Sequence, residues 1–267
     1  MYKIYIFFKR FLVTLISYKT ALALGILGSF VGLLQFTYMG NFLSDGNSFP
    51  ALQQYGGNLL AYLIIGTAFT SFVGVSLNSF QGTIRSEQQM GTLEYLLISN
   101  TRLELILLYS GVMNFVEAFL NVAILLTVVV FVFDIPLGIN LQGALLAMTL
   151  TITSLSGIGL MSAGIIIITK VGDPITWAFT TLTGLLSGVL FPIQYLPSWL
   201  QVVSATLPTT YALHALRMTL LKNAGIPEIM PQLLLLLVMT IITVPLGFII
   251  VRIGFNQSRK VGSLAQY

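Results

Sequence analysis

The amino-acid sequence predicts an all-α integral membrane protein with six transmembrane helices, and two observations carry this prediction. The chain of 267 residues is 56% hydrophobic and only 7% charged, whereas a soluble domain normally has about 25% charged residues. With a mean hydropathy of +0.94, its surface could not remain in water. The apolar residues also form long continuous runs, which are typical of membrane helices, whereas the strands of a membrane barrel alternate over ~10 residues.

Six apolar runs account for the predicted helices. A helix needs about 20 residues to cross ~30 Å of hydrocarbon. The third and fourth runs are longer than this and can tilt, and the fifth is short and ends at Pro192. The runs are Ala21–Met39, Leu59–Phe80, Leu105–Phe133, Leu141–Thr169, Ile175–Leu190 and Leu233–Val251.

The distribution of Lys and Arg predicts the orientation, because cytoplasmic loops carry an excess of these residues. Ten basic residues fall on the side of the two termini, and only Arg217 and Lys222 fall on the other. Both termini are therefore expected in the cytoplasm of a multi-pass plasma-membrane protein. This arrangement requires an even number of spans, and six satisfies it. The ten are Lys3, Lys9, Arg10, Lys19, Arg85, Arg102, Lys170, Arg252, Arg259 and Lys260.

The N-terminal segment, residues 1–19, is predicted to be an amphipathic helix in the membrane interface. Its polar residues share one helical face, while aromatic and aliphatic residues cover much of the rest. Lys19 would end an uncharged signal-peptide core, so a cleaved leader is not expected. The alternative is a frayed basic leader that only helps topology. The polar face consists of Lys3, Arg10, Thr14 and Ser17.

Composition also excludes several kinds of site. The chain has no cysteine and one histidine, so neither a thiolate nor a multi-histidine metal site can form, and no metal site is expected. The basic residues are dispersed, which argues against nucleic-acid binding. No lysine follows a glycine, so the phosphate-binding motif G-x-x-x-x-G-K-[ST] is absent and ATP hydrolysis must come from another polypeptide.

The segment 81–104 between the second and third runs is unusually charged. Read as a helix, it has an apolar side and a side that carries Glu87 and Glu94, whose carboxylates would face the cytosol and suit a basic partner. The alternative is a solvated loop whose charges only keep it out of lipid. The charged residues are Arg85, Glu87, Glu94, Arg102 and Glu104.

The region 191–222 on the opposite side combines aromatic residues with helix breakers. Phe191, Tyr195 and Trp199 suit a membrane–water belt. The positions of the helix-breaking prolines fit two short re-entrant or interfacial helices. An ordinary loop with anchoring aromatics is the alternative. His214 follows, and a lone histidine there is more typical of a hydrogen bond to a loop carbonyl than of catalysis. The breakers are Pro192, Pro197 and Pro208.

A polar stripe runs along the third apolar run, where Ser110, Asn114, Glu117 and Asn121 recur at helical spacing. A charge in the membrane centre costs roughly 2.5–3.5 kcal/mol on insertion scales, so the stripe should face protein or water. It either lines a substrate path or makes an inter-helix contact with a protonated Glu117.

Small residues also recur at steps of four, and such stripes let helices approach closely in lipid. Packing inside one protomer is the favoured interpretation, and a dimer seam or cavity wall is the alternative. The second run carries Gly66, Thr70, Gly74, Asn78 and Gly82, and the fifth carries Thr176, Thr180, Gly184 and Gly188.

Two motifs resemble the signatures of type-2 ABC exporter permeases, the membrane subunits of daunorubicin-resistance-like drug exporters and of lipid and polysaccharide exporters. The likeness covers about residues 10 to 250, with six spans in matching order. The first motif is Arg85-x-Glu87-x-x-x-Gly91-Thr92-Leu93-Glu94-x-Leu96-Leu97. The second is Gly188-x-Leu190-Phe191-Pro192-x-x-x-Leu196-Pro197-x-Trp199-Leu200, followed by Leu207-Pro208-x-x-Tyr211 and Leu216-Arg217.

The resemblance implies a role for each motif. The first would be the coupling segment that sits in a groove of a cytosolic ATPase and transmits its closure to the spans. The second would form short helices near the exit. The coupling residues, carried over by position, are Arg85, Glu87, Gly91, Thr92, Leu93 and Glu94; the outer-region residues are Phe191, Pro192, Pro197, Trp199, Pro208, Tyr211 and Arg217.

The resemblance also implies partners and activity. Two ATP-binding subunits would hold ATP and Mg²⁺, while this chain, a single permease domain over residues 1–267, would bind no cofactor and catalyse no reaction. A second permease would complete a homodimer or heterodimer in the membrane lipid. The substrate moved outward by alternating access would be an amphipathic drug, lipid, peptide or glycan-type molecule.

Two other classes of function stay open. Gly74-Val75-Ser76 resembles the nucleophile region of rhomboid proteases, and His214 would be the base of such an intramembrane serine hydrolase. A passive channel or membrane scaffold is the other class, and it would not need the coupling motif.

Overall fold

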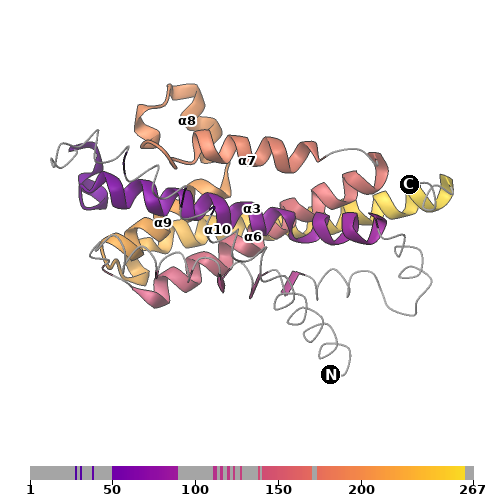
Figure 1. The fold of residues 1–267 in the computed structure, drawn as a ribbon, viewed down its shortest axis with the longest axis horizontal. Helices are drawn as coiled ribbons and strands as arrows, with labels where there is room; N and C mark the ends of the chain where they lie inside the picture. Colours follow the sequence, from indigo (N-terminus) through magenta and orange to yellow (C-terminus); the bar gives the residue numbers. More distant parts are fainter. Residues whose placement is uncertain are drawn as a thin grey trace.

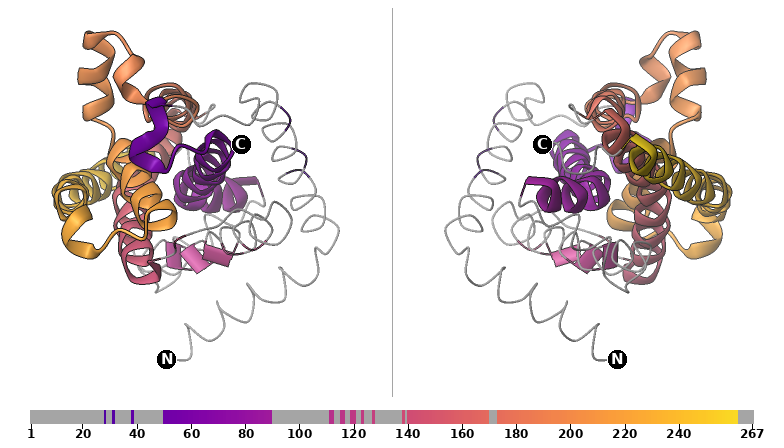
Figure 2. Two further views of the ribbon diagram at one scale, coloured as in Figure 1. Left: turned by 90° about the vertical axis from the view of Figure 1, so that its left-hand side faces the viewer. Right: turned by 90° about the vertical axis from the view of Figure 1, so that its right-hand side faces the viewer.

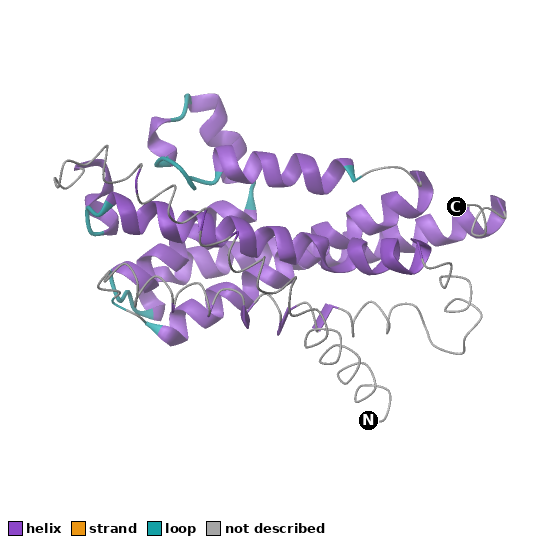
Figure 3. Ribbon diagram, viewed as in Figure 1, coloured by secondary structure: helices purple, strands orange, loops and turns teal. Residues whose placement is uncertain are grey.

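The computed structural model describes residues 50–89, 140–169 and 173–261, together with single positions at 28, 31, 38, 111, 112, 115, 116, 119, 120, 123, 127 and 138. Regular structure in this part of the chain is helical, without a strand, as predicted (Figures 1 and 3). Apart from those single positions, the predicted interfacial helix and the first and third predicted spans lie outside the described residues. The elements are η1 (Pro50–Tyr55), α3 (Leu59–Gln89), α6 (Leu141–Thr169), α7 (Pro174–Leu186), η2 (Ile193–Tyr195), α8 (Ser198–Ala205), α9 (Pro208–Leu221) and α10 (Ile226–Val261).

Three helices in the described part have the length and composition of membrane spans. They are Leu59–Asn78 within α3, Leu141–Thr169, which is all of α6, and Ile226–Gln257 within α10. They correspond to the second, fourth and sixth predicted runs. The predicted start of the last run at Leu233 is wrong by seven residues, because Pro231 near the start of α10 is accommodated inside the helix.

The fifth predicted run differs most from the structure. α7 has 13 residues, about 20 Å of helix at ~1.5 Å per residue, which is shorter than the hydrocarbon core. Asp173 caps its start by accepting a hydrogen bond from the Thr176 amide at 3.0 Å, and Pro174 follows at the first helical position. The predicted end at Leu190 is wrong by four residues, because Gly188 takes a φ of 81° that no α-helix allows.

The helices α3, α6 and α10 run in the same direction (Figure 1). At one end, the Asn140 side-chain amide before α6 donates to the Ala224 carbonyl before α10, at 2.9 Å. At the other end, Ile84, Ile167 and Phe255 share one apolar cluster. α7 runs the opposite way, since Asp173 at its start accepts a hydrogen bond from the hydroxyl of Ser162, well along α6. Viewed along the bundle, α6 lies between α3 and α10 (Figure 2).

Glycines bring α6 and α10 into backbone contact. A Cβ atom added at Gly247 would lie 2.5 Å from the Gly157 carbonyl oxygen, and one added at Gly254 would lie 2.5 Å from the Gly164 carbonyl oxygen. Both pairs are seven residues apart on their helices, so they repeat on one face. This close approach is the way small residues join helices in lipid. The small residues predicted to pack helices together lie in other spans, and this seam was not predicted.

The helix α9 lies among the spans rather than outside them. It packs against α3, α6 and α10, and most of its residues are buried. Its chain neighbour α7 runs lengthwise along the bundle, and α8 projects beyond the end of α7 (Figure 1). The apolar cluster around it includes Phe69, Phe72, Leu77, Ile152, Leu155, Ala212, Leu213, Leu216, Ile229 and Leu236.

Candidate functional site

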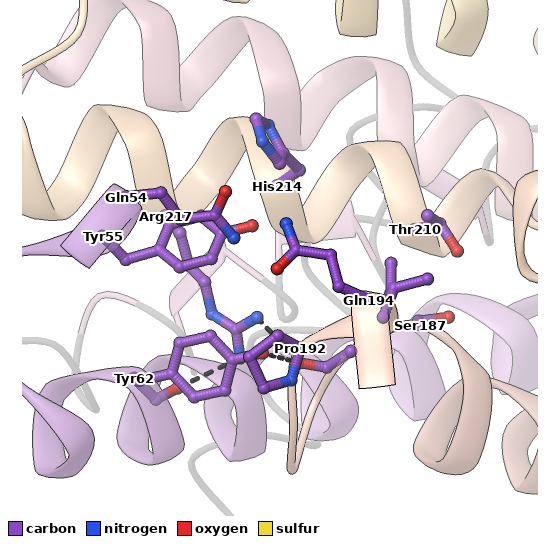
Figure 4. Close-up of a pocket in the computed structure, with 11 residues that line it drawn as sticks. Gln54, Tyr55, Tyr62, Ser187, Pro192, Gln194, Thr210, His214 and Arg217 are labelled. Carbon is purple, nitrogen blue, oxygen red and sulfur yellow. Dashed lines mark hydrogen bonds between the residues drawn. The ribbon is translucent and has the colours of Figure 1, made fainter. Parts of the chain in front are cut away.

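The most unusual group in the described structure is a buried cation, Arg217 of α9, which is only 2% exposed. Its Nη1 donates a hydrogen bond to the Gly188 carbonyl oxygen at 2.7 Å. Its Nη2 donates to the carbonyl oxygens of Val189 and Tyr62, both at 3.1 Å. The side chain therefore joins α9 to α3 and to the turn that follows α7 (Figure 4).

Two tyrosine rings complete the surroundings of this cation. The guanidinium carbon of Arg217 lies 3.4 Å from the centre of the Tyr62 ring and 5.5 Å from that of Tyr55. The Tyr62 hydroxyl donates to the Gly188 carbonyl at 2.6 Å. Arg217 forms no ion pair within the described part of the chain. Its charge is instead offset by carbonyl dipoles and by the negative faces of the rings.

These contacts account for the irregular backbone after α7. A helix end leaves carbonyl groups without partners, and such groups are tolerated beside lipid only where protein covers and satisfies them. Arg217 and Tyr62 supply the missing donors to Gly188 and Val189. The approach also requires Gly66 of α3, where an added Cβ would lie 2.5 Å from the Val189 oxygen and 2.9 Å from Nη2 of Arg217.

Buried hydroxyl groups fix the same region from the other side. The Thr209 hydroxyl at the start of α9 is hydrogen-bonded to those of Ser187 and Thr183 at the end of α7. Ser204 of α8 donates to the Leu186 carbonyl at 2.7 Å. The three short elements α7, α8 and α9 are therefore linked by hydroxyl and backbone groups rather than by charges.

A cavity of about 130 Å³ opens beside Arg217. His214 also lines it, one helical turn before Arg217, with its ring edge-on to Tyr55 at 5.7 Å. Nε of Arg217 and Nδ1 of His214 are buried without a hydrogen-bond partner. The lining residues are Gln54, Tyr55, Tyr62, Ser187, Gly188, Pro192, Ile193, Gln194, Thr210, His214 and Arg217 (Figure 4).

The environment shifts the pKa of three groups on η1 and α9, two elements that are not themselves membrane spans. Burial lowers the pKa of Arg217 to about 10, although the tyrosines oppose the shift, so the guanidinium stays charged at neutral pH. Burial, assisted by the charge of Arg217, lowers the pKa of His214, which is therefore neutral at pH 7. Burial raises the pKa of Tyr55 to about 12, so its hydroxyl stays protonated.

Comparison with known proteins identifies the family to which this arrangement belongs. Residues 2–221, well over half of the chain, match the family described as ABC-2 type transporter. The chain belongs to the ABC-2 type transporter family. It is thus a transmembrane permease component of an ABC transporter. No curated protein matches the chain.

The outer-region residues of this ABC-2 transporter all lie in the described structure. Trp199 and Tyr195 are 66% and 68% exposed, and Phe191 is 38% exposed, which suits a membrane–water belt. Tyr211 donates to the Ala205 carbonyl at 2.9 Å and ties α9 to α8. The three prolines stand where helices begin: Pro192 before η2, Pro197 before α8 and Pro208 at the first position of α9.

The other site residues predicted for the ABC-2 transporter are described only in part. Arg85 is exposed near the end of α3, and Glu87 belongs to the same helix. α3 thus extends nine residues past the predicted end at Phe80, into the charged segment. The remaining coupling residues, Gly91, Thr92, Leu93 and Glu94, and the stripe of Ser110, Asn114, Glu117 and Asn121 lie outside the described residues.

The small residues along α3 differ in what lies beside them. Gly66 packs against the turn after α7, as the favoured interpretation predicted. An added Cβ at Gly74 or Gly82, however, would meet nothing within 4 Å, and the same holds for Gly184 of α7. Within the described part of the chain, these positions are therefore not packed closely against a neighbouring helix.

Tyr55 and Tyr62, the ring partners of Arg217, were not predicted from the sequence. Tyr62 looks like any other aromatic residue in an apolar run, and Tyr55 lies in a connection that carried no motif. One signal was available, because an arginine within a mostly apolar region needs polar or aromatic partners.

The serine and histidine of the hydrolase alternative are not brought together. His214 lines the cavity with Tyr62, whereas Ser76 lies 14 positions further along α3, roughly 20 Å along the helix axis. The hydroxyl of Ser76 donates to the Phe72 carbonyl at 2.8 Å. This geometry offers no nucleophile–base pair.

Proposed function

We propose that the chain is the membrane permease of an ABC exporter and that a separate ATPase subunit binds the segment 81–104. The observation that carries this proposal is the motif from Arg85 to Leu97 in a chain of the ABC-2 family. With no phosphate-binding motif of its own, the permease relies on two ATPase subunits that hold ATP and Mg²⁺.

The continuity of α3 supports a lever mechanism. This single helix of 31 residues carries Arg85 near one end and Tyr62 near the other, about 35 Å apart at ~1.5 Å per residue. Tyr62 holds the Gly188 carbonyl and stacks on Arg217. When ATP binding closes the ATPases, movement of the coupling segment would be transmitted along α3 to the outer region.

The directions of the helices support six spans. Because α3, α6 and α10 run the same way, the chain must cross back between each pair. α7 and the short helices after it provide the return between α6 and α10, and the apolar run Leu105–Phe133 is suited to the return between α3 and α6. With the first run Ala21–Met39, the total is six, and both termini lie in the cytoplasm at the plasma membrane.

The position of α9 supports re-entrant outer helices. Its first turn is bonded to α7 through Thr209 and Thr183, three residues before α7 ends. Its last turn lies beside Asn140, whose backbone amide donates to the Thr219 carbonyl at 3.0 Å. The chain thus goes inward after α8 and returns outward through α9.

A second permease copy, identical or related, would complete the path on the open face of α3. Ser71 and Asn78 are exposed there, although their own helix satisfies them, and Gly74 between them leaves space. Such a face of small polar residues suits a protomer seam or a substrate path better than lipid. Its mixed character favours an amphipathic drug, lipid, peptide or glycan-type substrate, moved outward by alternating access.

The proposal is tested by co-purification of the native ATPase with tagged permease from membranes. Glu94→Lys should leave the permease inserted but reduce ATPase recovery and substrate-dependent ATP turnover, because it places a cation where a basic surface binds. Glu228→Lys makes the same charge change at the opposite end of the bundle and should retain the ATPase. Equal recovery with both variants would count against the coupling role, and a permease that never captures an ATPase would favour a channel or scaffold.

A further inference from the structure

The cavity beside Arg217 contains a cation without an acidic partner. Among the eleven described residues that line it, one is positively charged and none is acidic. A buried charge is costly unless it is paired. The carbonyl groups and rings around Arg217 supply partial negative charge, but no described group supplies a full one.

Polar atoms without hydrogen-bond partners in the cavity wall also favour a bound anion. Nε of Arg217, on a side chain 98% shielded from solvent, keeps a donor without an acceptor, and Nδ1 of His214 in the same wall is also unpaired. The side-chain amides of Gln54 and Gln194 add further donors to the wall. The hydroxyl groups of Ser187 and Thr210 are already hydrogen-bonded, to the Thr209 hydroxyl and to the Ser204 carbonyl. A bound group with several acceptor oxygens suits Nε of Arg217 and the two amides.

The size and opening of the cavity limit the guest. The volume of the cavity is about 130 Å³. It has room for a compact tetrahedral group and not for a whole lipid or sugar chain. Gln194 is exposed and Gln54 is half-buried, so a group attached to a larger molecule can enter from that side.

We propose that this cavity binds a phosphate-type oxyanion beside Arg217, either as the headgroup of an anionic phospholipid or as a free phosphate. The site is separate from the coupling segment and does not depend on the proposed transport. The guanidinium supplies the charge, and the lining side chains orient the oxygens. The bound group also neutralises the cation that holds the turn after α7.

The test uses the full chain, purified, stripped of lipid and kept in a phosphate-free buffer. Inorganic phosphate is titrated while thermal unfolding is followed, and retention of phosphatidylglycerol from nanodiscs is measured by native mass spectrometry. Gln54→Glu puts a carboxylate in the cavity wall and should weaken binding by about tenfold or more. Gln53→Glu makes the same change on the neighbouring exposed residue, which does not line the cavity, and should bind as the wild type does.

Each outcome decides the proposal. Retention of phosphatidylglycerol without a response to phosphate assigns the site to a lipid headgroup, and the reverse assigns it to a soluble anion. The absence of both overturns the proposal, since water alone then fills the cavity. Equal binding by the two glutamate variants also overturns it, because the anion then lies elsewhere. Variants of Arg217 are not used, since they would disturb the fold.

Discussion

The guanidinium carbon of Arg217 lies 3.4 Å from the centre of the Tyr62 ring, although 155 residues of chain separate the two. Both side chains donate to the same carbonyl group, that of Gly188. A cation from helix α9 and a ring from the membrane span α3 therefore bind the same turn of backbone from two sides. This pairing makes the region between α7 and α9 part of the bundle rather than an appended loop.

Replacing the cation should loosen this region. Arg217→Leu leaves the Val189 carbonyl without a donor and removes the bridge to Tyr62, so the free energy of unfolding should fall by about 2–4 kcal/mol. Arg217→Lys should recover part of the loss, because an ammonium group cannot match the planar fork. Thermal unfolding in detergent measures both. Lys222→Leu removes an exposed cation at the end of α9 and should change little; a similar loss there would mean that net charge, not the bridge, matters.

The two kinds of glycine on α3 should respond differently to alanine. Gly66→Ala forces a Cβ to within 2.5 Å of the Val189 oxygen and should cost about 1–3 kcal/mol of stability through overpacking. Gly74→Ala has open space and should be neutral or slightly stabilising, since alanine is the better helix former by about 1 kcal/mol. Unfolding of the two variants in parallel tests the contrast, which fails if Gly74→Ala is the less stable protein.

The sequence was sufficient to predict the elements that depend on local pattern. The apolar runs located α3, α6 and α10 because length and hydropathy alone specify a span. Pro192, Pro197 and Pro208 were predicted to break helices, and each stands at or just before the start of a short helix, because proline is not tolerated in a helix interior. The family was also predicted correctly, since its motifs are local.

Features that depend on two distant segments were not predictable in the same way. The end of α7 was predicted too late, because the apolar run continues through Leu190 while Gly188 is held by donors from α3 and α9. The α6–α10 seam was missed because a glycine in one span indicates close packing only when its partner in the other span is known. Tyr62 was not predicted as the partner of Arg217 for the same reason, because the two residues lie far apart in the sequence.

Stability should fall at mildly acidic pH through His214. The pKa of this residue is lowered in the folded protein by burial and by Arg217, so the unfolded chain binds the proton more readily. Stability is therefore full above the ordinary histidine pKa of about 6.5 and is lost as the pH falls from there toward the folded value.

As the chain has one histidine, His214→Gln should flatten the stability profile between pH 7 and pH 5, while carboxylates retain their own effect at lower pH. Thermal unfolding of wild type and variant across this range is the measurement. Parallel profiles for the two proteins would show that the histidine does not contribute.

The seam between α6 and α10 should be sensitive to the smallest enlargement. Gly254→Ala puts a Cβ 2.5 Å from the Gly164 oxygen, so the helices must separate along a contact that otherwise joins backbone to backbone. The expected loss is about 1–3 kcal/mol. Gly184→Ala, in open space on α7, is the matched control and should unfold as the wild type does. Gly247→Ala tests the same seam one repeat away. Because both substitutions push the same two helices apart, the double variant should lose less than the sum of the single losses; strict additivity would mean that the two contacts yield independently and that α10 does not move as a rigid body.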